Sequence, residues 1–74
     1  MDNLLQPLVR IGKNGLTPGI VEEIKKQLKK HPVVKIKLLH AFQEDKHVTA
    51  ETLAEECNAE LVRVVGKTVV LGRK

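Results

Sequence analysis

The fold is decided by residues 9–18, which read VRIGKNGLTP. Apolar and polar residues alternate from Leu4 to Ile11, and this period of two predicts a β-strand. Positions 12–15 then hold two glycines and an asparagine, residues that tolerate a positive φ, so we expect the strand to end in a turn. Thr17 can cap a helix, and Pro18 suits the first helical position because its missing N–H is not needed there. The stretch therefore predicts a strand, a glycine turn and a helix start in direct succession.

The elements around this stretch follow from the proline positions and from hydrophobic periodicity. Pro7 cannot donate to a sheet ladder, so the first strand is expected either to lie at an edge or to enter the sheet after Pro7. The helix is expected to end at His31-Pro32, since the residue before a proline disfavours helical geometry. Alternation over residues 33–39 predicts a second strand.

The second half of the chain predicts one helix and a hairpin. A stripe of apolar residues favours a helix that begins between Asp45 and Thr49 and stops near Asn58. Residues 61–65 and 68–71 are predicted strands. The Gly-Lys dipeptide between them suits a two-residue hairpin, with glycine where a type II′ turn needs it.

The resulting order is β-α-β-α-β-β. Two strand–helix–strand passages require crossover connections, which place strands in parallel, while the final hairpin is antiparallel. Residues 1–74 are therefore expected to form a single two-layer α/β domain, in which helices pack on a four-stranded mixed sheet.

The composition limits the classes of function. The 74 residues include one Phe, no Tyr and no Trp, which argues against proteins that stack nucleobases on aromatic rings. Lys and Arg number 13 against nine acidic residues. A basic excess without aromatic rings favours contact with a phosphate backbone.

Cysteine, histidine and hydropathy exclude further classes. Cys57 is the only cysteine, so no internal disulfide can form, and the three histidines show no paired ligand spacing. We therefore expect no metal and no other cofactor. No apolar run approaches the roughly 20 residues of a membrane span, so we expect a cytoplasmic protein without a membrane partner.

Charge is segregated along the chain. The formal net charge is +5 over residues 1–43, −5 over residues 44–60 and +4 over residues 61–74. The second predicted helix is therefore an acidic segment between two basic ones, a pattern typical of a directional electrostatic surface.

The glycine turn is the first candidate site. It joins a strand to a helix start, where backbone N–H groups and the positive end of the helix dipole can converge on an anion such as phosphate. Lys13 adds a positive charge and Asn14 a side-chain amide. Walker and dinucleotide motifs do not fit, because Asn follows the Lys and a third glycine is missing. Phosphate contact and a plain strand-to-helix turn both stay open as interpretations.

Basic residues form the second candidate site. The first helix carries a cluster that would either extend the phosphate contact or be a solvated face: Lys25, Lys26, Lys29 and Lys30. Lys35 and Lys37 share one side of the second strand, and Arg63 is expected to join them across the sheet. Cations that would widen this surface are Arg10, Lys67, Arg73 and Lys74.

The sequence contains no catalytic set. Serine is absent, and Cys57 lies on the apolar stripe of the second helix. Glu55 and Glu56 point to different sides of that helix. We therefore expect a protein that is not an enzyme and has no small-molecule substrate.

Four blocks of the sequence resemble the CRM domain, the YhbY-like family of small RNA-binding proteins. In the order of that family they are VRIGKNGLT (9–17), GIVEEI (19–24), VKIK (34–37) and VVGKTVVL (64–71). The resemblance implies a fold similar to the C-terminal domain of translation initiation factor three. It also implies that the GxxG loop at positions 12–15 contacts RNA.

Bacterial stand-alone members of the family differ from this chain at one end. They carry a further helix before the first strand, whereas only Met1 to about Leu5 precede it here. We expect that helix to be absent or reduced to a turn, and one sheet face to be less covered.

The resemblance also implies a cellular process. Stand-alone members are tied to maturation of the large ribosomal subunit, which implies ribosome biogenesis, with rRNA or pre-ribosomal particles as partners and ribosomal proteins as further ones. The sequence thus predicts an RNA-binding module that contacts the phosphates of structured RNA. The residues predicted to bind are Arg10, Gly12, Lys13, Asn14, Gly15, Lys25, Lys26, Lys29, Lys30, Lys35, Lys37 and Lys67. The alternative is a protein-interaction adaptor on ribosomal particles that uses the acidic second helix, with Glu51, Glu55 and Glu56.

Overall fold

The computed structural model describes residues 8–74 and confirms the predicted order of elements. The elements are β1 (Leu8–Ile11), α1 (Pro18–Lys30), β2 (Val33–Leu38), α2 (Lys46–Glu56), β3 (Ala59–Val65) and β4 (Thr68–Arg73). The start of the first predicted strand, residues 4–7, lies outside the described residues, as does the predicted lack of an N-terminal helix.

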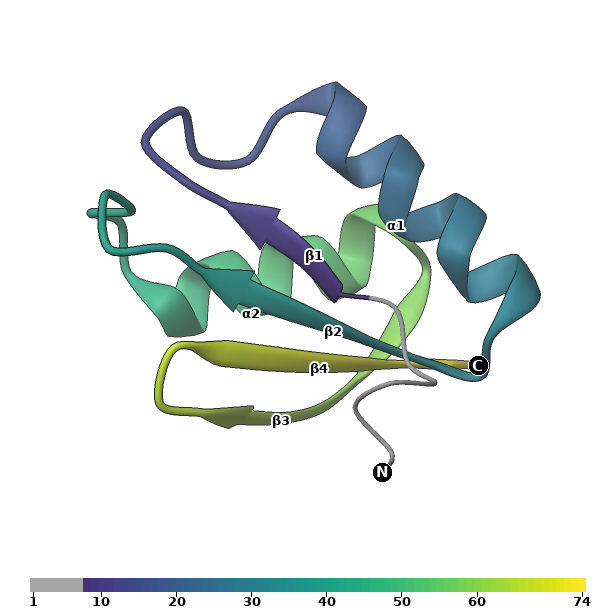
Figure 1. Ribbon diagram of the computed structural model, residues 1–74. Helices are drawn as coiled ribbons and strands as arrows, with labels where there is room; N and C mark the ends of the chain where they lie inside the picture. The colour runs from purple at the N-terminus through teal and green to yellow at the C-terminus, as the bar shows by residue number, and fades with distance from the viewer. Residues whose placement is uncertain (1–7) are drawn as a thin grey trace.

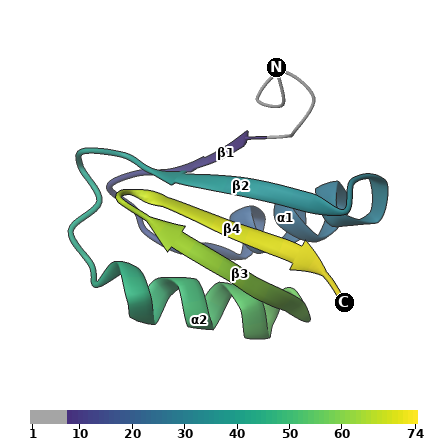
Figure 2. The same ribbon diagram turned by 90° about the horizontal axis from the view of Figure 1, so that it is seen from below.

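The four strands form one mixed sheet in the order β1-β2-β4-β3. β1 pairs parallel with β2, whereas β4 pairs antiparallel with both β2 and β3. β1 therefore lies at an edge, which is one of the two placements that Pro7 allowed. Both helices lie on the same side of the sheet (Figure 1, Figure 2), so no described helix covers the opposite face.

The α1 helix begins and ends where the sequence predicts. Thr17 is its N-cap, and the Thr17 hydroxyl accepts a hydrogen bond from the Ile20 N–H at 3.3 Å. His31 is the C-cap, with extended backbone ahead of Pro32. Between these ends the helix buries one stripe against the sheet: Val21, Ile24 and Leu28.

The α2 helix is capped by a charged residue. The Asp45 carboxylate accepts hydrogen bonds from the backbone N–H groups of His47 at 2.8 Å and Val48 at 3.1 Å. These two donors stabilise the ionised form and hold the pKa of Asp45 below its usual value, with Val48 the larger cause. Asn58, with a φ of +52°, ends the turn after the helix, as predicted for a residue that tolerates the left-handed region.

The core lies between the sheet and the two helices. Its largest fully buried side chains come from both layers and include Ile11, Ile24, Ile36, Leu53 and Leu71. Each contributes about 1.5–3 kcal/mol by leaving water. This packing fixes α1 on the sheet and thereby determines which way its lysines point.

Three predicted strand boundaries are wrong. β2 ends at Leu38 because the next residue opens a turn, in which the Phe42 N–H donates to the Leu39 carbonyl at 2.9 Å. The two hairpin strands are each two residues longer than predicted, since Ala59 pairs with Arg73 and Glu60 with Gly72. Residues of low β propensity such as Ala, Glu and Gly hid this pairing from the sequence.

A β-bulge interrupts the pairing of β3 with β4 between Leu61 and Arg63. Val62 is the extra residue, and its methyl group lies 3.1 Å from where a Cβ on Gly72 would be, so glycine fits this place best. The bulge shifts the alternation of β3 by one residue. As a result Leu61 and Val64 both pack against the core, although they are three residues apart.

Candidate nucleic-acid interface

The glycine turn is a closed β-turn with Lys13 and Asn14 at its exposed tip. The Gly15 N–H donates to the Gly12 carbonyl at 3.0 Å, which closes the turn. Gly15 has a φ of +67°, the region that favours glycine. The turn therefore presents its tip to solvent, while the Gly15 N–H is already bonded.

A carboxylate lies against this turn, which the sequence did not predict. A Cβ placed on Gly15 would lie 2.5 Å from the Glu44 Oε2 atom, so Glu44 occupies the space beside the glycine. Glu44 comes from the loop between β2 and α2, about 30 residues further along the chain. Its negative charge opposes a phosphate on that side, so an anion has to approach from the tip, where Lys13 and Asn14 lie.

The start of α1 has fewer free backbone N–H groups than the strand–turn–helix pattern predicts. Pro18 has no N–H, and the Ile20 N–H is already bonded to the Thr17 hydroxyl. The Val21 N–H donates to the Thr17 carbonyl at 3.1 Å. The helix dipole still favours an anion here, but Lys13 and Asn14 are the groups best placed to bind one.

The α1 lysines form a second basic region, which we call the helix face: Lys25, Lys26, Lys29 and Lys30. Lys26, Lys29 and Lys30 are exposed. Lys25 is half-buried, and its ammonium lies 3.6 Å from the Glu22 carboxylate. A helix of 13 residues is roughly 20 Å long, so the last turn with Lys29 and Lys30 lies far from the glycine turn. The two predicted sites are therefore at opposite ends of α1 (Figure 1).

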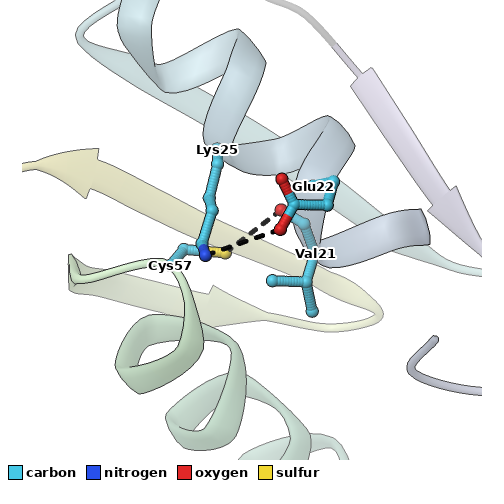
Figure 3. Close-up of polar contacts among 4 residues, drawn as sticks. All are labelled: Val21, Glu22, Lys25 and Cys57. Carbon is cyan, nitrogen blue, oxygen red and sulfur yellow. Dashed lines mark hydrogen bonds and ion pairs between the residues drawn. The ribbon is translucent and has the colours of Figure 1, made fainter. Parts of the chain in front are cut away.

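A hollow of about 470 Å³ separates α1 from the end of α2 and is lined by Lys25, Leu28, Lys29, Cys57, Asn58 and Arg73. The Lys25 side chain extends toward Cys57 from α1 (Figure 3). The Cys57 thiol donates to the Val21 carbonyl at 3.8 Å, and burial raises the pKa of that thiol. Cys57 is thus a buried thiol that packs α2 against α1, and its environment disfavours the thiolate.

Arg73 has a structural role that the sequence analysis missed. Its Nε donates to the Leu28 carbonyl at 2.9 Å and its Nη2 to the Lys29 carbonyl at 3.5 Å. The Arg73 N–H also donates to the Pro32 carbonyl at 2.8 Å. The guanidinium therefore satisfies carbonyls at the negative end of the α1 dipole, which ties β4 to α1.

Four further predicted cations lie on the sheet surface away from the helices, which we call the sheet face: Arg10, Lys35, Lys37 and Arg63. Arg10 is the register partner of Lys37 across β1 and β2. Lys35 is opposite Val70, and Val70 is opposite Arg63 on β3. These register positions bring Arg63 into the same row as Lys35, as predicted. The bulge makes this possible, because unbroken alternation from Leu61 would turn Arg63 toward the core.

Lys67 lies at the end of the sheet where the glycine turn begins. Its carbonyl accepts a hydrogen bond from the Leu38 N–H at 2.7 Å, and Leu38 is paired with Ile11 just before the turn. The Gly66 carbonyl beside it accepts from the Lys46 ammonium at 2.9 Å. Lys67 and Lys13 are thus at one end of the domain, and the predicted residues divide into this end, the helix face and the sheet face.

Among residues 8–74, no three His, Cys, Asp or Glu side chains gather in a way that could hold a metal ion. None of the described helices has the length and apolar character needed to cross a membrane.

Comparison with known proteins gives consistent matches. The model of the CRS1 / YhbY (CRM) domain matches residues 2–73. A Methanocaldococcus jannaschii protein named a probable RNA-binding protein is 41% identical over 71 residues, which cover 93% of this chain and 52% of that protein. A Haemophilus influenzae protein named an RNA-binding protein is 36% identical over 69 residues, 93% of this chain and 70% of that one. The chain thus spans about half the length of the archaeal relative.

A solved structure shares the fold. The solution structure of a hypothetical protein from Staphylococcus aureus superposes with a TM-score of 0.78 at 32% identity. The match covers 97% of this chain and 75% of that one.

Proposed function

The chain belongs to the CRS1/YhbY (CRM) domain family, and we propose that it is a non-enzymatic module that binds the phosphate backbone of structured RNA. In this proposal the α1 helix face and the tip of the glycine turn contact phosphates. Lys67 lies at the same end as the turn and extends the contact there. The RNA-binding names of the relatives support the proposal.

The single observation that carries the proposal is the exposed α1 cluster of Lys26, Lys29 and Lys30. Among the described residues none of the three forms an ion pair, whereas their neighbour Lys25 pairs with Glu22. Such side chains can neutralise phosphates and release counterions without sequence preference. A domain with a single aromatic residue has little means of stacking bases, which fits backbone contact better than base readout.

We further propose that the RNA is ribosomal and that binding serves assembly of the large ribosomal subunit. This part rests on the family to which the chain belongs. Backbone contact suits such a role, because pre-ribosomal RNA offers folded helices whose shape and phosphates are accessible, while side chains cannot read the bases in their deep, narrow major groove.

The proposal is tested with a labelled rRNA hairpin and the triple variant Lys26→Glu, Lys29→Glu, Lys30→Glu. Reversing three contacts should weaken binding by about 10- to 100-fold at moderate salt, and should lower the salt dependence. The matched control replaces the same three lysines by arginine, which keeps the charge and should keep the affinity. Circular dichroism verifies the fold of both variants. Equal affinity of the wild type and the glutamate variant would contradict the proposal.

The glycine turn needs a separate test that leaves Gly15 in place. A side chain at Gly15 would be strained at a φ of +67° and would meet Glu44, so such a variant would report on folding as well as binding. Lys13→Ala changes only the exposed tip and should weaken binding by about three- to tenfold, as expected for one lost phosphate contact. Unchanged affinity would leave the turn as a purely structural link and refute its part in the proposal.

One observation favours the adaptor as a second candidate. Val48 is 60% exposed near the start of α2, close in sequence to the exposed Glu51. An exposed apolar residue among carboxylates suits a basic protein partner. Pull-down from lysate with and without ribonuclease separates the two candidates. A partner that survives RNA digestion and is lost in Glu51→Lys would favour the adaptor.

A further inference from the structure

The sheet face carries exposed cations with few acidic side chains beside them. Arg10, Lys37 and Arg63 are exposed, and none of them forms an ion pair within residues 8–74. Lys35 lies between them on the same face. The acidic residue on this face among the paired positions is Glu60, which sits opposite Gly72 toward the other end of β3.

The strand register keeps two of these cations side by side. Arg10 and Lys37 are paired positions on neighbouring strands, and neighbouring strands lie about 4.8 Å apart. Like charges at directly opposed positions of a sheet are destabilising. A bound anion would offset this repulsion, so the two neighbouring cations are electrostatically more favourable with an anionic ligand bound than in the free protein.

The β3 bulge adds the third cation. Val62 takes up the extra position, and Arg63 therefore stands opposite Val70 on the outer side of the sheet. The cations thus extend over β1, β2 and β3, a distance of roughly 14 Å for three strand spacings. A spread of single charges over a sheet fits a phosphate backbone, which repeats its charges, better than it fits an isolated small anion.

The helix face and the sheet face are on opposite layers of the domain. The buried stripe of α1 faces the sheet, so the lysines of α1 point away from it, while the sheet face looks the other way (Figure 2). The shortest extent of the domain is 20 Å between Cα positions. One straight RNA segment cannot contact both layers at once, so ligands on the two faces are separate segments.

We propose that the sheet face is a second phosphate-binding surface and that one domain bridges two RNA segments, one on each layer. The inference rests on the proposed function, because the first segment is the one that the helix face binds. The second segment is bound through Arg10, Lys37 and Arg63. Such a domain brings RNA segments together without reading their bases.

The test is a bridging assay with two non-complementary RNA hairpins, one carrying a donor fluorophore and the other an acceptor. Wild-type protein should produce energy transfer that rises with protein concentration and falls again in excess protein, because each RNA then has its own protein. The variant Arg10→Gln, Lys37→Gln, Arg63→Gln should lose the energy transfer and still bind one hairpin through α1. Glu60→Gln alters the same face without removing a cation, and it should bridge at least as well as the wild type.

The outcomes separate this inference from the proposed function. Normal energy transfer in the sheet-face variant, or equal loss in Glu60→Gln, would overturn the second surface. Absence of energy transfer in the wild type, under conditions where it binds each hairpin, would overturn bridging. Bridging by one domain would also be overturned if sedimentation showed that energy transfer occurs only when the protein is a dimer. The same holds if the sheet face binds an acidic protein in place of RNA. If the α1 glutamate variant bridges normally, the helix face does not hold the first segment, and the proposed function fails together with this inference.

Discussion

The helix face and the sheet face both carry four cations, but the cations have different relations to the fold. Lys29 and Lys30 lie in the last turn of α1. A positive charge there interacts favourably with the negative end of the helix dipole and stabilises the helix by about 0.3–1 kcal/mol per residue. Arg10 and Lys37 are held as neighbours on the sheet, where like charges cost stability. Charge at a helix end therefore gains from the helix dipole without any ligand, whereas two like charges paired on an open sheet gain nothing from each other. This difference makes the sheet face the more informative of the two.

The largest expected effect comes from removing the packing that fixes the two faces on opposite layers. Ile24 is fully buried between α1 and the sheet. Ile24→Ala should lower the free energy of unfolding by about 2–5 kcal/mol, through lost burial and a residual cavity. Urea denaturation measures this loss. A decrease of less than about 1 kcal/mol would mean that α1 is not held as described.

The next effect concerns how the sheet layer supports the helix face. Arg73 on β4 donates to the carbonyls of Leu28 and Lys29 at the end of α1. Arg73→Ala should cost about 1–2 kcal/mol, because carbonyls at the helix end lose a charged donor. Hydrogen exchange should show faster opening of the last turn of α1 and no change in α2. Uniformly faster exchange in both helices would contradict a local role.

Neutralising the cations should change stability in opposite directions on the two faces. Replacing Lys29 and Lys30 by Gln should destabilise the domain by roughly 0.5–1 kcal/mol, since the dipole loses its partners. Replacing Arg10 and Lys37 by Gln should leave stability unchanged or raise it by a few tenths of a kcal/mol. Thermal unfolding at low salt compares the two. Equal destabilisation by both variants would contradict the different relation of the two faces to the stability of the fold.

The smallest expected effect is a pH dependence of stability that comes from the N-cap of α2 and not from the N-cap of α1. The folded pKa of Asp45 is lowered, so its contribution to stability is complete above the unfolded value near 3.8 and is lost as pH falls through the folded pKa. Acid should therefore weaken the start of α2, whereas Thr17 at α1 does not titrate. Between pH 5 and about 3 the melting temperature of Asp45→Ala should fall less than that of the wild type. If the melting temperatures of the two proteins fall in parallel, Asp45 is not the source of the acid sensitivity.

The sequence predicted features that depend on nearby residues. The caps of α1 follow from Thr17, Pro18 and His31-Pro32, each of which restricts the backbone next to it. The edge position of β1 is one of the two placements that Pro7 left open. Hydrophobic periodicity between these breakers then indicated the order of elements, which the structure confirms.

Features that depend on distant residues could not be predicted. Glu44 lies against Gly15, and Arg73 bonds the end of α1, although in each case the partners are far apart in the sequence. The bulge at Val62 leaves no local signal, because valine fits a regular strand equally well. The division of the basic residues into two layers also depends on packing, since a count of charges does not say which way α1 turns.

The most direct measurement is an NMR titration of the isotope-labelled protein with an rRNA hairpin, following every backbone amide. The account predicts shifts at Lys13, Lys26, Lys29 and Lys30, and a separate set of shifts at Arg10, Lys37 and Arg63. The glutamine variant of the sheet face should lose only the second set. Shifts confined to α2, or loss of the α1 set in the sheet-face variant, would contradict an RNA-binding helix face that acts independently of the sheet.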